Sequence, residues 1–165
     1  MRILLPIFLL ALFVAGCDDA RVYEQNYDFE KRVWLVSDKP NFEFEVTNAV
    51  DRYTLYCNVR NSVAFPYSRL FVKYELKDST GKLLGGKMMP AFLFDQHTGE
   101  PQGSSGLGDI YDHRFPFLTN YQFPSPGKYS VTFEQFMRKD TLDGILAVGL
   151  RVERGSEVHP AAGQK

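Results

Sequence analysis

The sequence has few of the residue types on which most catalytic and metal sites depend. Only two cysteines and three histidines occur among its 165 residues. They are too few and too scattered to supply the paired ligands of a structural zinc site, so we expect no metal and no cofactor. An excess of charge of one sign is also missing, because 19 Lys and Arg balance 20 Asp and Glu. Without a basic excess, nucleic acid is not an expected partner.

No apolar run is long enough to cross a membrane as a helix, which takes about 20 residues. The longest run, residues 3–16, follows Arg2 and is typical of a secretory signal peptide. It ends in Val14-Ala15-Gly16-Cys17, which resembles the lipobox that bacterial lipoprotein signal peptidase recognises. We therefore predict a lipoprotein signal peptide over residues 1–16 and acylation of Cys17, with fatty-acyl (palmitate) chains as the membrane anchor.

Aromatic residues, in contrast, are abundant, with 14 Phe, 9 Tyr and 1 Trp. Much of the chain alternates apolar and polar residues, as strands with one buried face do, and turn residues separate these segments. We predict an all-β fold, an antiparallel β-sandwich (Ig-like or jelly-roll) of about 7–8 strands. The expected strands cover residues 41–46, 53–60, 70–77, 129–136 and 145–152, with weaker signals at 32–36, 87–94 and 109–118.

The length of the chain suits a single folded domain. We expect a lipidated tether over residues 17–27, the β-sandwich over residues 28–154 and a flexible tail over residues 155–165. The glycine-rich segment 95–108 is expected to be a long loop, either functional or mobile. Its residues 103–108 lack both the Gly-Lys-Ser/Thr ending of a phosphate loop and the spacing of a nucleophile elbow.

Candidate catalytic residues are sparse. Asp109, Asp112 and His113 form the one local cluster of metal-type ligands. On a strand, Asp109 and His113 face one side and Asp112 the other, so the three do not converge. Cys57 has no partner for an intramolecular disulfide once Cys17 is acylated, and we interpret it as a small buried hydrophobe rather than a nucleophile. We therefore predict that the protein is not an enzyme.

Some aromatic residues occupy positions where the pattern expects polar ones. Tyr56 and Phe71 lie on the polar faces of their strands, and Phe65-Pro66-Tyr67 lies in a loop. Exposed aromatic side chains anchor protein interfaces or stack on sugars. The alternative is that the sandwich is buried on both faces at these points. We take Phe65 and Tyr67 as candidate partner-binding residues.

Four patterned segments of the body carry a family resemblance. They are LYCNVRN at 55–61, FPYSRL at 65–70, GLGDIY at 106–111 and, with Met137-Arg138, LDGILAVGLRVE at 142–153. Together with Cys17 and the start Arg21-Val22-Tyr23, they resemble the gliding-motility lipoprotein family GldH of Bacteroidetes over nearly the whole mature chain. This family brings no catalytic residues, only the acylated cysteine, which Cys17 matches.

The resemblance implies an outer-membrane-associated lipoprotein of the gliding machinery, linked to type IX protein secretion, that works by protein–protein interaction. Its partners would be the membrane, through the lipid, and other envelope, gliding or secretion proteins. In an organism that does not glide, the role would be envelope assembly or secretion. The alternative is a surface-exposed module that binds glycan or peptide. Asp18 and Asp19 are either part of a solvated tether or of a surface-export signal, which leaves the membrane face open.

Overall fold

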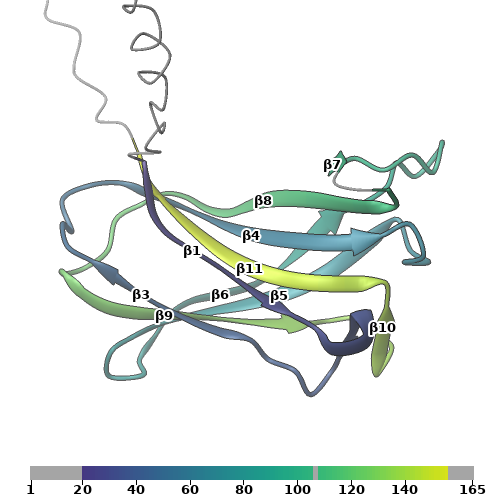
Figure 1. Cartoon of the computed structure of the whole chain (residues 1–165). Coiled ribbons are helices and arrows are strands. Elements are labelled where there is room, and N and C mark those ends of the chain that lie inside the picture. The colour runs from purple at the N-terminus through teal and green to yellow at the C-terminus, as the bar shows by residue number, and fades with distance from the viewer. Residues whose placement is uncertain (1–19, 106–107, 156–165) are drawn as a thin grey trace, which may run out of the picture.

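The computed structural model describes residues 20–105 and 108–155, which form an antiparallel β-sandwich (Figure 1). This confirms the predicted fold class, although the strands are more numerous than the expected 7–8. In chain order they are β1 (Arg21–Asp28), β2 (Val33–Leu35), β3 (Asn41–Val46), β4 (Tyr53–Ser62), β5 (Arg69–Asp78), β6 (Leu83–Phe92), β7 (Ser104–Ser105), β8 (Ile110–Tyr121), β9 (Gly127–Gln135), β10 (Thr141–Asp143) and β11 (Ile145–Arg154). A single 3-10 turn, Glu30–Arg32, precedes β2.

Two sheets make the sandwich. One has five strands in the order β1-β11-β4-β8-β7, and the other has four in the order β3-β9-β5-β6. The short strands β10 and β2 pair with each other beside them. The chain passes directly from one main sheet to the other between β3 and β4, β4 and β5, β6 and β7, and β8 and β9. Hydrophobic periodicity does not fix this order, because it says which face of a strand is buried and not which strand lies next to it.

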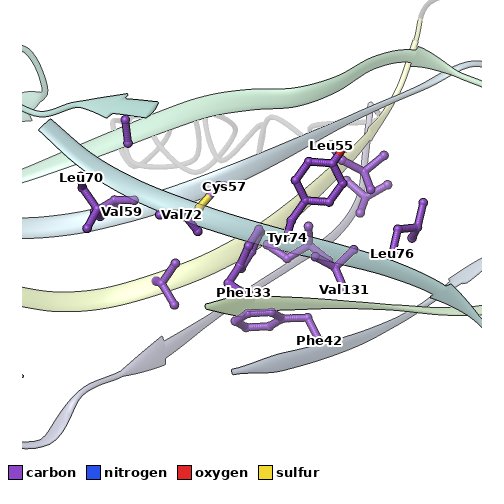
Figure 2. Packing of buried hydrophobic residues seen from close by; sticks show 14 of the residues in the cluster. Phe42, Leu55, Cys57, Val59, Leu70, Val72, Tyr74, Leu76, Val131 and Phe133 are labelled. Carbon is purple, nitrogen blue, oxygen red and sulfur yellow. The ribbon is translucent and has the colours of Figure 1, made fainter. Parts of the chain in front are cut away.

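The core lies between the two main sheets and follows the predicted alternation. In β3, every second residue is buried, and β4, β5 and β9 show the same alternation over most of their length. Figure 2 shows the resulting layers, with side chains of β4 facing those of β5, β9 and β3. Trp34 is fully buried at one end of this core, where its indole N–H donates to the carbonyl of Asp38 over 2.9 Å.

Strand β1 corrects the predicted tether. Residues 21–27 were expected to link the lipid to the domain, but they pair along β11, from Arg21 opposite Glu153 to Asp28 opposite Ala147. The sequence of β1 hides this because β1 is an edge strand whose side chains are mostly exposed. Hydrogen bonding to a neighbour defines such a strand, so it needs no alternation of apolar residues.

Strand β11 corrects the predicted inner face of residues 145–152. The alternation placed Leu146 inside, yet Ile145 is fully buried and Leu146 is only half-buried. The register explains the difference, because Ile145 lies opposite Asn61 and Ala147 opposite Arg60, so one residue bulges out between them. A bulge of this kind shifts the alternation by one position. From Val148 onward the predicted inner positions are buried as expected.

Several predictions fall outside the described residues. These are the signal peptide over residues 1–16, the acylation of Cys17, and residues 156–165 of the tail. Within residues 20–105 and 108–155, no helix is long and apolar enough to span a membrane.

Candidate functional site

Both ends of the described chain meet at one end of the sandwich, which we call the Ala20 end. There the backbone N–H of Arg154 donates to the carbonyl of Ala20 over 2.7 Å. The opposite end, which we call the Tyr67 end, carries the Phe65-Pro66-Tyr67 loop and the glycine-rich loop that begins at Asp95 (Figure 1). The two loops lie side by side, since Leu93 donates to the carbonyl of Ser68 and Val63 donates to that of Asp109. The candidate partner-binding residues and the glycine-rich loop therefore lie at the end opposite the chain entry.

Phe65 does not have the exposure expected of a partner-binding residue. Its side chain is 3% exposed and belongs to the core. A tight turn, in which Phe65 N–H donates to the carbonyl of Ser62, directs the ring inward. Tyr67, two residues on, is 36% exposed and packs edge-on against Phe65 with ring centroids 5.5 Å apart. Phe65 is thus a core residue that supports Tyr67, and a role of Tyr67 in binding stays a prediction.

Tyr67 borders an apolar hollow on the outer face of the four-stranded sheet, with a volume of about 810 Å³. We call it the Tyr67 hollow. Its apolar walls include exposed side chains, above all Phe136, which is 56% exposed, and Met88. The full lining is Val36, Tyr67, Phe71, Met88, Glu134, Gln135, Phe136, Met137, Arg138 and Lys139. A concave apolar surface with this much exposure is typical of binding sites.

The register of β5 explains where the hollow lies. The outward residues of β5 are charged toward the Ala20 end, where Lys73 and Lys77 both pair with Glu75. Toward the Tyr67 end the outward residue is Phe71, which lies opposite Pro90 of β6, and Phe136 donates its N–H to the carbonyl of Phe71. The outer face of this sheet therefore changes from charged to apolar along one strand.

Cations without acidic partners surround the hollow. Glu134 is held by Lys39 at 2.9 Å and approached by Lys73 at 3.9 Å. Arg69 instead lies over the rings of Phe71 and Phe92, at 5.6 and 5.0 Å from their centroids. Among the described residues, no ion pair involves Arg69, Arg138 or Lys139. The Tyr67 hollow therefore combines an apolar floor with a positive rim.

The glycine-rich loop 95–108 is more hydrogen-bonded than its composition suggests. The Asp95 carboxylate accepts from the N–H groups of His97 and Thr98 over 2.8 and 2.9 Å. These bonds outweigh the opposing effect of desolvation and hold the pKa of Asp95 below its ordinary value. Gln102 donates to the carbonyl of Leu93, and Ser104 pairs with Asp112 through β7. Residues 106–107 lie outside the described part of the chain.

The cluster of Asp109, Asp112 and His113 does not come together. Asp112 forms an exposed ion pair with Arg60 at 2.7 Å, on the outer face of the five-stranded sheet. His113 points the other way, is buried, and stacks on Phe115 with centroids 5.6 Å apart. Among the described residues, no three His, Cys, Asp or Glu side chains are grouped so that they could hold a metal. Cys57 is buried as predicted, and burial raises the pKa of its thiol.

His113 predicts a pH-dependent stability. Burial lowers the pKa of its imidazole, and the charge of Asp112 opposes this only in part. In the unfolded chain the pKa of His113 is about 6.5, so the unfolded chain binds a proton at this residue more readily than the folded one. Protonation of His113 therefore does not affect the free energy of unfolding above this pH. As pH falls through it, the free energy of unfolding decreases, by about 1.4 kcal/mol for each unit of difference between the two pKa values.

The variant His113→Gln should remove this dependence. Urea unfolding between pH 7 and pH 5 is expected to show a flatter profile for the variant than for the unaltered protein. Parallel profiles would contradict the assignment, because they would mean that other groups cause the loss of stability in this range.

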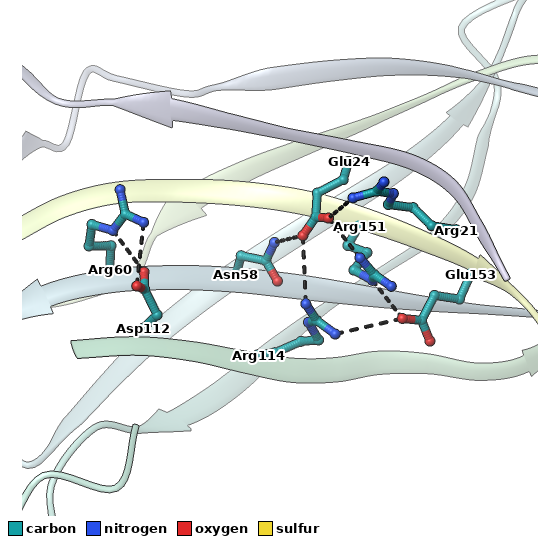
Figure 3. Close-up of polar contacts among 8 residues, drawn as sticks. All are labelled: Arg21, Glu24, Asn58, Arg60, Asp112, Arg114, Arg151 and Glu153. Carbon is teal, nitrogen blue, oxygen red and sulfur yellow. Dashed lines mark hydrogen bonds and ion pairs between the residues drawn. The ribbon is translucent and has the colours of Figure 1, made fainter. Parts of the chain in front are cut away.

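A polar network on the outer face of the five-stranded sheet is the feature that sequence reasoning missed (Figure 3). Arg151 of β11 is 6% exposed and donates to Glu24 of β1 over 2.7 Å and also to Glu153. Arg114 of β8 approaches both carboxylates at 3.7 Å, and Asn58 of β4 donates to Glu24 over 3.0 Å. Four strands thus contribute to one network. It could be found only by knowing that β1 pairs with β11.

The charges of this network compensate one another. Desolvation raises the pKa of Glu24, but the hydrogen bonds from Arg151, Asn58 and Arg21 outweigh it, and the net pKa is lowered. A hollow of about 460 Å³, lined in part by Glu24, Asn58 and Arg114, adjoins the network. Because Glu24 is held by cations of the protein itself, we interpret the network as a structural clamp that fastens β1 to the sheet.

Comparisons with known proteins match this chain over nearly its whole length. It is 32% identical over 155 residues to a gliding motility lipoprotein GldH homolog of Christiangramia forsetii, covering 90% of this chain and 92% of the relative. It is 23% identical over 158 residues to the gliding motility lipoprotein GldH of Flavobacterium johnsoniae, covering 90% of this chain and 94% of the relative.

Solved structures add no argument about fold or function. The chain matches an infectious bursal disease virus structure at a TM-score of 0.35 and 10% identity, spanning 86% of this chain and only 32% of the viral one. The family comparison is different, because the profile of the GldH lipoproteins matches residues 21–152, which include β1 to β10 and most of β11. The chain therefore belongs to the GldH lipoprotein family, a family of lipoproteins associated with gliding motility.

Proposed function

We propose that this protein is a lipid-anchored component of an envelope complex, acylated at Cys17, that acts by binding another protein in the Tyr67 hollow. The observation that carries the proposal is the exposed apolar floor of this hollow, at the end of the sandwich opposite the chain entry. A patch of this kind on an otherwise polar outer face favours association over turnover. In keeping with the family resemblance, we place the complex at the outer membrane and in gliding or type IX secretion.

The chemistry of the hollow indicates the kind of partner. Tyr67, Phe71, Phe136 and Met88 offer the aromatic and thioether surface that protein interfaces favour. The rim cations Arg69, Arg138 and Lys139 would steer a negatively charged partner toward it. We infer a protein segment with apolar side chains flanked by Asp or Glu. The lipid anchor would raise the local concentration of both components, so a contact of modest affinity would suffice.

The proposal predicts that polar substitutions in the hollow weaken the complex without unfolding the domain. Phe136→Ser combined with Met88→Ser removes two exposed apolar side chains, so each should change the free energy of unfolding by only about 0.5 kcal/mol. Recovery of the partner by chemical cross-linking and co-purification from membranes should fall at least about tenfold, which corresponds to about 1.4 kcal/mol of binding energy.

The matched control is Val63→Ser. Val63 is an exposed apolar residue at the same end of the sandwich, but it does not line the hollow. It should leave co-purification unchanged. Arg138→Glu with Lys139→Glu should also weaken the complex, and more strongly at low salt, since screening reduces the repulsion at high salt. Undiminished co-purification of the Phe136 and Met88 variant would place the interface elsewhere.

A further inference from the structure

The structure leaves little chain between the proposed lipid and the folded domain. Strand β1 begins at Arg21, and the bond from Arg154 N–H to the carbonyl of Ala20 holds Ala20 against the sandwich. The chain from Cys17 to Ala20 can span at most about 11 Å, since each residue extends about 3.6 Å. If the lipid on Cys17 is in the bilayer, the Ala20 end cannot lie far from the lipid headgroups. The expected tether over residues 17–27 would have allowed a much larger separation.

Three connections lie at this end beside Ala20. They join β3 to β4, β5 to β6 and β8 to β9. The register places them together, because Val46 at the end of β3 pairs with Gly127 at the start of β9, and Tyr53 at the start of β4 pairs with Arg154. Figure 1 shows these loops at the end where the chain enters and leaves.

The surface of these connections has the composition of a membrane-contacting face. Val50, in the β3–β4 connection, is 79% exposed, more than any other large apolar side chain in the described part of the protein. Leu83, which begins β6, is also exposed. Asp51 is neutralised by Arg154 at 3.1 Å, and Asp78 accepts N–H bonds from Thr80 and Lys82 within its own turn.

Three basic side chains at this end form no salt bridges in the described part of the chain, although Lys82 lies near Asp78 and Lys128 lies opposite Glu45. Arg52, Lys82 and Lys128 are exposed and take part in no ion pair among the described residues. Basic residues close to an anionic membrane surface are attracted to it. The outer face of the five-stranded sheet, the other surface near Ala20, presents charges that are already paired with one another (Figure 3).

We propose that the Ala20 end rests on the lipid headgroups, with Val50 against the bilayer and the strands pointing away from it. This inference rests on the proposed acylation of Cys17. The contact itself is weak, because Val50 offers only a small apolar area to the bilayer, and the short link to the lipid maintains it. The Tyr67 hollow is then held at about the length of a ten-residue strand, roughly 30 Å, from the membrane.

Lipid-headgroup quenching of a fluorescent label tests this orientation. The full-length acylated protein is reconstituted in vesicles of phosphatidylethanolamine and phosphatidylglycerol that contain a nitroxide headgroup lipid. Bimane is attached at Val50→Cys or, as the matched control at the other end, at Val63→Cys, since both sites are exposed apolar positions. Cys57 is buried and stays unlabelled. We expect quenching at residue 50 to be at least threefold stronger than at residue 63.

The outcomes separate the two proposals. Mass spectrometry of the N-terminal peptide first reports acylation, and an unmodified Cys17 would overturn the proposed anchoring itself. With acylation established, equal quenching at both sites would show a domain lying flat, and absence of quenching at residue 50 would show a domain held away from the lipid. Either result overturns the orientation and leaves the anchoring intact.

A Gly-Ser insertion of about 15 residues after Asp19 tests the role of the short link. It should release the domain and reduce quenching at residue 50, and unchanged quenching would refute that role.

Discussion

Truncation of Phe133 to Ala is expected to destabilise the domain by about 3–5 kcal/mol, the range found for buried Phe side chains. Phe133 is fully buried between the sheets and packs against Phe42 of β3 and Phe117 of β8, with ring centroids 5.9 and 5.5 Å apart. The variant loses the transfer energy of the ring and leaves a cavity that neighbours from both sheets line. This loss is a large part of the total stability of about 5–15 kcal/mol of a typical domain.

Urea unfolding followed by the fluorescence of the single tryptophan, Trp34, measures this effect. Thr132→Ala is the control on the same strand. Thr132 faces outward, and its hydroxyl donates to Asn41 over 2.9 Å in an exposed bond, so its loss should cost less than about 1 kcal/mol. Equal losses for the two variants would contradict the assignment of an inner and an outer face to β9.

The inner faces of these strands could be predicted from the sequence because the alternation within each strand indicates which of its residues are buried. In β3, Phe42, Phe44 and Val46 alternate with polar residues, and such a pattern needs no knowledge of the neighbouring strand. The same holds for Phe133 of β9. Strand β1 gives no such signal, since its side chains are mostly exposed and do not alternate between buried and exposed positions. For that reason the sequence alone predicts a tether where β1 pairs with β11 from Arg21 to Asp28.

Only some of the residues that line the Tyr67 hollow could be predicted from the sequence. The sequence places the aromatic residues Phe71 and Tyr67 outside the expected core, and both line the hollow. Its other walls come from β6, from the end of β9 and from the segments after β2 and β9. The hollow therefore depends on strand order, which the alternation of apolar and polar residues does not indicate. The burial of Phe65 has a similar origin, because it depends on the turn after β4 and on a glycine far away in the sequence, Gly144.

Gly144 joins β10 to β11 and is tied to two other segments. Its N–H donates to the carbonyl of Arg32, and its own carbonyl accepts from the N–H of Ser62. Its φ of +85° lies in the left-handed region, which glycine adopts without strain. A Cβ at this position would lie 2.6 Å from the backbone nitrogen of Phe65 and 2.9 Å from its Cα. Only a glycine therefore lets the turn that buries Phe65 pass this close.

Gly144→Ala is accordingly expected to cost about 3 kcal/mol or more, from left-handed strain of about 1–2 kcal/mol and partial loss of the burial of Phe65. Gly81→Ala separates the two causes, because Gly81 has nearly the same φ of +84° but no atom within 4 Å of its Cβ position. It should cost only the strain. Urea unfolding compares the two variants, and equal losses would show that the Phe65 turn does not depend on Gly144.

Since Tyr67 packs on Phe65, the displacement of Phe65 in Gly144→Ala should also reshape the Tyr67 hollow. Co-purification of the partner by Gly144→Ala should then fall under conditions in which the domain is still folded, whereas Gly81→Ala should retain it.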